Sequence, residues 1–134
     1  MPGRKAARLI VGLSAVVAIL GMAISAEAQE KKIKIGVVYD LTGPLAGGGS
    51  ELGYIGAKIM LDHYAKTGVE GYKGEAVYAD AQSKPDIAIN EAVRLLEQEK
   101  GDMVMGFFSS AQCVPVAARV EQLKKFMWIT TCIS

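Results

Sequence analysis

The sequence predicts an α/β fold in which a parallel sheet carries helices on both faces. Three observations in its 134 residues support this prediction. Short runs of apolar and β-branched residues alternate with longer segments whose apolar residues recur at helical spacing. Turns rich in glycine and proline separate these segments. The resulting order begins and ends with a strand and places a helix between each pair of strands, and such helical crossovers cover both faces of a parallel sheet.

The first strand is expected at residues 33–39, which read Ile-Lys-Ile-Gly-Val-Val-Tyr. A loop over residues 40–50 should follow, because this stretch combines turn residues with three consecutive glycines. Helical spacing then predicts a helix from Glu51 to Thr67, which Gly68 ends. One face of that helix would carry Leu52, Ile55, Ile59 and His63.

The second strand is expected at residues 76–80. The second helix follows it, with Ser83 as its cap and Pro85 in its first turn, and ends at Gly101. Its apolar face comprises Ile89, Ala92, Val93 and Leu96. Residues 103–108 form a continuous apolar run, which is typical of a strand buried on both faces.

A third helix and a fourth strand complete the expected sheet. The helix opens at Ser109-Ser110 with Val116, Val120 and Leu123 on one face, and residues 126–131 form the strand. Open parallel sheets bind ligands at the carboxyl ends of their strands. In this chain those ends are residues 40–50, 80–83, 109–111 and 131–134.

The first 28 residues predict a secretory signal peptide. A basic start is followed by an apolar stretch over residues 9–24 and by Ala26-Glu27-Ala28, whose small residues suit a cleavage site. An uncleaved membrane anchor is the alternative, since the apolar stretch approaches the length that spans a bilayer. The compartment expected for the remaining residues, 29–134, is the periplasm or the exterior of the cell.

Composition excludes several classes of function. The formal net charge is +1, and Arg4, Lys5 and Arg8 lie in the first eight residues, so the rest of the chain is close to neutral. Binding of nucleic acid through a basic surface is therefore not expected. Two cysteines and one histidine rule out a Cys-rich zinc site and a histidine-based metal cluster, and no cofactor or metal is expected. In an oxidising compartment Cys113 and Cys132 could be oxidised, or they could remain buried thiols.

Candidate catalytic residues are sparse. The glycines at 47–49 do not match a dinucleotide-binding or P-loop motif. A nucleophile at Cys113 or Ser110 would need a nearby base, and His63 is the one imidazole. Asp40 and Asp80 each follow a strand and could act as paired carboxylates, but capping of turns is the simpler interpretation.

Ser109 and Ser110 form the most informative pair. They follow a strand and open a helix, where the first backbone N–H groups lack helical acceptors and the helix dipole is positive. Two hydroxyls beside such N–H groups can bind a carboxylate without a charged side chain. An ordinary N-cap is the alternative function of either serine. Small polar residues at the end of the fourth strand, Thr130 to Ser134, support a ligand site at this edge.

Several segments together resemble a known family. They are residues 33–37 with Leu41-Thr42-Gly43-Pro44, residues 80–85, Ser109-Ser110 after the apolar strand, and Trp128-Ile129-Thr130. In their order and spacing they are similar to the periplasmic ligand-binding proteins of ABC importers, of the branched-chain amino acid (Leu/Ile/Val) type.

The resemblance implies a type I periplasmic binding protein, whose two α/β lobes close on a small solute and deliver it to an ABC permease in the inner membrane. Residues 29–134 would then be an incomplete amino-terminal lobe, and the 134 residues an amino-terminal fragment. The ligand would be an amino acid, an amide or an aromatic carboxylate. No reaction would be catalysed.

By position, the resemblance assigns ligand contacts to six residues. Ser110 would bind the carboxylate with Ser109 and Ala111 beside it, the next loop would contribute Cys132 and Ser134, and Gly48 lies where the family often places an aromatic residue. The family's disulfide in this lobe falls at other positions, so a bridge between Cys113 and Cys132 is not predicted.

Two other classes of function compete with solute binding. One is an exported α/β enzyme that uses Asp40, Asp80 or Cys113. The other is a small sensor module whose open sheet edge pairs with another chain.

Overall fold

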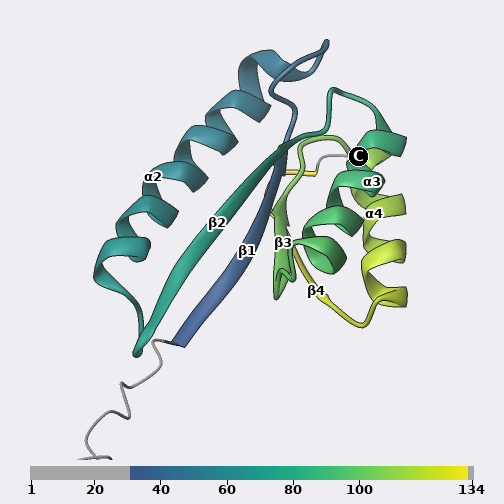
Figure 1. The fold of residues 1–134 in the computed structure, drawn as a ribbon. Coiled ribbons are helices and arrows are strands. Elements are labelled where there is room, and N and C mark those ends of the chain that lie inside the picture. Colours follow the sequence, from purple (N-terminus) through teal and green to yellow (C-terminus); the bar gives the residue numbers. More distant parts are fainter. Residues whose placement is uncertain (1–30, 133–134) are drawn as a thin grey trace, which may run out of the picture. The chain divides into compact units, whose positions relative to one another are not determined.

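A computed structural model describes residues 31–132, and these form one four-stranded parallel sheet with helices on both faces (Figure 1). The predicted fold class is confirmed. The signal peptide expected at residues 1–28 and the site residue Ser134 lie outside the described residues. The strand order is β2-β1-β3-β4. The strands are β1 (Lys31–Tyr39), β2 (Tyr72–Asp80), β3 (Met103–Gly106) and β4 (Phe126–Ile129).

Three α-helices connect the strands, and two short π-helical segments adjoin them. One helix, α2, covers one face of the sheet, and α3 and α4 pack side by side on the other (Figure 1). Among residues 31–132, no helix is long and apolar enough to span a membrane. The bounds are η1 (Ala46–Ser50), α2 (Glu51–Thr67), α3 (Pro85–Val93), η2 (Arg94–Gln98) and α4 (Ser110–Gln122).

The hydrophobic core lies between the sheet and the helices α3 and α4. The inward faces predicted for these helices are confirmed, because Ala92, Leu96, Val116 and Val120 are buried there. Leu95 also joins this core. Gly36 of β1 lets it approach closely, since a Cβ at Gly36 would lie 2.9 Å from the Leu95 Cβ.

The face of α2 that carries the predicted apolar stripe points to solvent. Leu52 is 71% exposed and Ile59 is 63% exposed. The opposite side of the helix contacts the sheet, where Gly53 faces the Tyr39 ring and the Tyr54 ring meets Tyr78 edge-on at 5.5 Å. The predicted apolar stripe thus lies on the outer side, while Gly53 and Tyr54 are among the residues that contact the sheet.

The apolar strand also differs from its prediction, because β3 is not buried on both faces. Val104 is buried, whereas Met103 and Met105 are half-buried. The α2 helix lies over β2 and β1, so the neighbouring part of that face is less covered (Figure 1). Phe126 and Trp128 of β4 are exposed as a result.

Several predicted boundaries need correction. β2 begins at Tyr72 rather than at residue 76, and β3 and β4 each end two residues earlier than predicted. The loop at residues 40–50 contains the π-helical segment η1, although Gly47 and Gly48 within it have non-helical φ and ψ angles. Ser83 does not cap α3. Lys84 occupies the N-cap position, with Pro85 in the first helical position as predicted.

Candidate functional site

The turn between β3 and α4 is built around an unusual backbone conformation. Gly106 has φ +115°, and a Cβ there would collide with the carbonyl oxygen of Val38. Phe107 has φ +66° and is fully buried, and its N–H donates to the Val38 carbonyl at 2.7 Å. Only glycine tolerates the first conformation without strain. The two residues turn the chain sharply out of the sheet, so that α4 begins at its carboxyl edge.

Ser109 is the N-cap of α4, which confirms the alternative function considered for this pair. Its hydroxyl accepts a hydrogen bond from the N–H of Ala111 at 3.3 Å, and its carbonyl accepts from Gln112 and Cys113 at 3.0 Å each. The Ser110 hydroxyl forms no hydrogen bond to any residue from 31 to 132. Ser110 is half-buried at the positive end of a 13-residue helix, which is a favourable position for an anion.

The residues after β4 are tied to the same turn. The N–H and hydroxyl of Thr130 donate to the Gly106 carbonyl at 3.2 and 3.0 Å, and the Thr131 hydroxyl donates to the Phe107 carbonyl at 3.1 Å. The Tyr39 hydroxyl lies 2.9 Å from the Thr130 hydroxyl. The ends of β1, β3 and β4 therefore meet at one edge, as expected for parallel strands.

A disulfide joins Cys113 in α4 to Cys132 after β4, with 6.4 Å between the Cα atoms. This bridge was not predicted from the sequence, which left open whether the two cysteines are oxidised or remain thiols. Both residues lie at the carboxyl edge because α4 begins where β4 ends, and their Cα separation suits a disulfide. The pairing of the neighbouring elements β3 and β4 brings them together.

A hollow of about 440 Å³ adjoins the disulfide. Two of the predicted site residues, Ser110 and Cys132, line it together. Ser109 and Ala111 flank Ser110 at the start of α4 but do not line this hollow. The remaining lining residues are Cys113, Val114, Ala117 and Ile129.

Gly48 lies in η1 with φ +70° and open space around the position of a Cβ. It does not line the hollow beside Ser110. The loop nevertheless touches the β3–α4 turn, because a Cβ on the next residue, Gly49, would overlap the Phe108 ring. Gly48 thus lies one residue from a contact with the segment that leads into Ser109.

Asp40 and Asp80 hold turns at this edge, as the simpler interpretation predicted. The Asp80 carboxylate accepts hydrogen bonds from the N–H groups of Leu41, Thr42 and Gln82 and from the Thr42 hydroxyl, at 2.6 to 3.2 Å. Partial burial acts to raise the pKa of Asp80, but these hydrogen bonds together outweigh it and lower the pKa below its ordinary value.

Asp40 is fully buried, and its Oδ1 accepts hydrogen bonds from the N–H of Ser83 and from Nε2 of Gln112. Gln112 is not among the residues predicted from the sequence. It lies in the first turn of α4, 72 residues from Asp40, and no local pattern connects the two.

The geometry gives little support to catalysis. Cys113 is in a disulfide, and His63 is exposed on α2 with its ring against Tyr64. No group of three or more His, Cys, Asp or Glu residues within the described part of the chain is placed to hold a metal ion.

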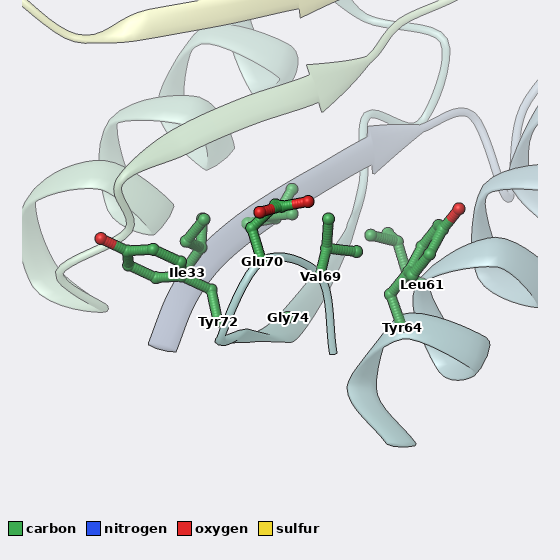
Figure 2. A pocket seen from close by; sticks show the side chains of 8 residues that line it. Ile33, Leu61, Tyr64, Val69, Glu70, Tyr72 and Gly74 are labelled. Carbon is green, nitrogen blue, oxygen red and sulfur yellow. The ribbon is translucent and has the colours of Figure 1, made fainter. Parts of the chain in front are cut away.

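A separate pocket of about 280 Å³ lies between α2 and the amino-terminal ends of β1 and β2 (Figure 2). Apolar and aromatic side chains dominate its lining, and Glu70 is the one charged residue among them. The residues are Ile33, Ile35, Leu61, Tyr64, Val69, Glu70, Tyr72 and Gly74. It lies at the opposite ends of the strands from the edge that carries Ser110.

The sequence matches a known family. A family model described as periplasmic binding protein matches residues 32–131. The "Leu/Ile/Val-binding protein homolog 7" of Brucella suis is 38% identical over 115 residues, which is 85% of this chain and 27% of the relative. The chain therefore spans about a quarter of the length of the curated relatives it matches.

Two solved structures share the fold. The branched-chain amino acid transporter substrate-binding protein of Streptococcus pneumoniae, in complex with isoleucine, superposes with a TM-score of 0.72 at 24% identity and covers 78% of this chain and 30% of that chain. An ABC transporter solute-binding protein of R. palustris, in complex with 4-hydroxybenzoate, gives a TM-score of 0.63 at 25% identity, covering 78% and 28%.

Proposed function

This chain belongs to the periplasmic binding protein family, and on that premise we propose that it forms the start of the ligand-binding lobe of an ABC importer's solute-binding component. Residues 29–134 would be an incomplete amino-terminal lobe. The family consists of solute-binding proteins, so the proposed activity is binding without chemistry. A signal peptide over residues 1–28 would direct the chain to the periplasm, where the bound solute would pass to an inner-membrane permease.

The start of α4 is the observation that carries this proposal. Ser110 lies at a positive helix end with a hydroxyl that the described residues leave unused, and Cys132 lies beside it. A ligand carboxylate placed there would accept a hydrogen bond from that hydroxyl and would lie at the positive end of the helix. The N–H groups of Ala111, Gln112 and Cys113 already donate to Ser109. Ser109, Ala111, Ser134 and Gly48 would complete this side of the site.

A small carboxylate is the ligand class that this helix end favours. The Brucella suis relative is named for leucine, isoleucine and valine, and the R. palustris structure contains 4-hydroxybenzoate. All of these ligands carry a carboxylate. An aliphatic amino acid is the first candidate, because the relative with 38% identity is named for leucine, isoleucine and valine. An aromatic carboxylate or an amide is the second candidate.

The test compares Ser110→Ala with a matched control in a two-lobe protein that contains residues 31–132. A panel of amino acids, amides and benzoates is screened by thermal shift, and affinity is measured by calorimetry. Removal of the Ser110 hydroxyl should weaken binding of the selected ligand by about 1–3 kcal/mol. Thr67→Ala removes a hydroxyl at the far end of α2 and should leave affinity unchanged. No stabilising solute in the panel, or equal affinity of both variants, would contradict the proposal.

A further inference from the structure

The buried polar residues within the described part of the chain are Asp40, Ser50 and Gln112. They are connected to one another. The Asp40 N–H donates to the Ser50 hydroxyl at 2.8 Å, and the Gln112 Nε2 donates to Asp40 Oδ1 at 2.6 Å. The N–H of Ser83 donates to the same oxygen at 2.7 Å. All three side chains are at most 1% exposed, so solvent cannot replace a lost partner.

This cluster joins four segments that are distant in sequence. Asp40 directly follows β1, and Ser50 ends η1 at the start of α2. Ser83 lies in the turn before α3, and Gln112 lies in the first turn of α4. The contact between Asp40 and Gln112 is the one that fixes the start of α4 to the central strand β1. The strength of a buried hydrogen bond to a carboxylate depends on its distance and angle. Such a bond can therefore hold the first turn of α4 in a defined position.

Gln112 is two residues from Ser110. The two side chains lie in different environments. Gln112 is buried against Asp40, whereas Ser110 lines the hollow at the carboxyl edge of the sheet. Asp40 Oδ2 and Gln112 Oε1 have no hydrogen-bond partner among residues 31–132. A rotated Gln112 amide would turn its oxygen toward Asp40 Oδ1 and lose the bond, so a single orientation of this amide is favoured.

We propose that Asp40 and Gln112 are positioning residues for the ligand site, and that their hydrogen bond holds the first turn of α4 in the orientation that binds a carboxylate. The inference rests on the proposed function for the identity of the ligand. The positioning itself can be measured without any ligand.

Gln112→Met tests the proposal, because methionine has a similar length and shape but lacks the amide donor. Hydrogen exchange in the 134-residue chain should become about tenfold faster at the amides of Gln112 and Cys113, which follows from the loss of one buried hydrogen bond. Exchange in β1 and β2 should change less. Asp40→Asn keeps the accepting Oδ1 and replaces the unpaired Oδ2, so its exchange in the first turn should stay near that of the parent.

Gln122→Met is the matched control, since it makes the same substitution at an exposed position near the end of α4. Unchanged exchange in the first turn for Gln112→Met, or an equal increase throughout the chain, would overturn the positioning role. Affinity in the two-lobe protein then separates the two proposals. Absence of any ligand refutes the proposed function, whereas normal affinity of Gln112→Met for a ligand that Ser110→Ala binds weakly refutes only the positioning.

Discussion

Asp80 shows how one side chain organises the carboxyl edge of the sheet. Its carboxylate accepts hydrogen bonds from Leu41 and Thr42, which follow β1, and from Gln82, which follows β2. These donors stabilise the ionised form, and they lower the pKa in the folded state despite partial burial. The native state therefore binds a proton at Asp80 less readily than the unfolded chain does.

The Asp80 pKa leads to a prediction on pH. Because the folded pKa lies below the ordinary value of 3.8, the stabilisation is complete well above that value and is lost as the pH falls through the folded pKa. Asp80→Asn should lower the free energy of unfolding by about 1–2 kcal/mol at pH 7, and by progressively less as the pH falls toward 3. Urea unfolding at several pH values measures the difference.

Asp62→Asn is the control for this experiment. Asp62 forms a solvent-exposed pair with Lys58 at 2.9 Å on α2, and its loss should change the free energy of unfolding little. A difference between the parent chain and Asp80→Asn that does not vary from pH 7 to pH 3 would contradict the prediction.

Single residues also mark where sequence-based prediction reached its limit. The turn-holding roles of Asp40 and Asp80 were expected, because each directly follows a strand. The partnership of Asp40 with Gln112 was not, since hydrogen bonds between residues so far apart leave no local pattern. The positive φ of Phe107 was not foreseen either, because a buried aromatic residue in this conformation depends on the surrounding packing.

At the scale of elements, the disulfide between Cys113 and Cys132 ties the first turn of α4 to the end of β4. It closes a chain segment with a sequence separation of 19 residues. Both ends of the bridge adjoin predicted ligand residues, Ser110 among them. The disulfide therefore restrains the same edge that the hydrogen bonds of Thr130 and Thr131 hold together.

Removal of this disulfide should destabilise the chain. The loop length predicts a loss of about 3 kcal/mol for the double variant Cys113→Ser/Cys132→Ser. Denaturant unfolding with and without a phosphine reductant provides the measurement, with alkylation and mass spectrometry to count free thiols. Reductant should lower the stability of the parent chain toward that of the double variant and leave the variant itself unchanged. A parent chain with two free thiols before reduction would refute the bridge.

Element boundaries were predicted well where local chemistry sets them. The start and end of α2 at Glu51 and Thr67 agree with the structure, and so does the start of α4 at Ser110. Local spacing identified the buried faces of α3 and α4, whereas the apolar stripe that it identified on α2 is exposed. On that helix small and aromatic residues contact the sheet, and such contacts depend on Tyr39 and Tyr78 from the strands.

For the described part of the molecule as a whole, the main feature is uneven coverage of apolar surface. Leu52, Ile55 and Ile59 are exposed on α2, and Phe126, Trp128 and Ile129 are exposed on β4. The latter strand is also an edge of the sheet. Exposed apolar groups at an unpaired strand edge favour association between chains.

This surface predicts concentration-dependent self-association of the 134-residue chain. Trp128→Lys should reduce it, because lysine on an edge strand opposes pairing and removes an exposed aromatic ring. Sedimentation velocity over a range of concentrations measures the change. Gln122→Lys adds the same charge without removing apolar surface and is the matched control. Monomeric behaviour of the parent chain at all concentrations, or equal reduction by both variants, would contradict this prediction.

The sequence by itself determined the alternation of strands and helices, most of their boundaries and the placement of small polar residues after β3 and β4. Each of these depends on neighbouring residues, through periodicity, capping and turn chemistry. The tertiary structure alone decided the strand order, the face of α2 that meets the sheet, the pairing of Cys113 with Cys132 and the contact of Asp40 with Gln112. These features arise from packing between segments that are far apart in the chain, and their free energies appear only when the sheet has assembled.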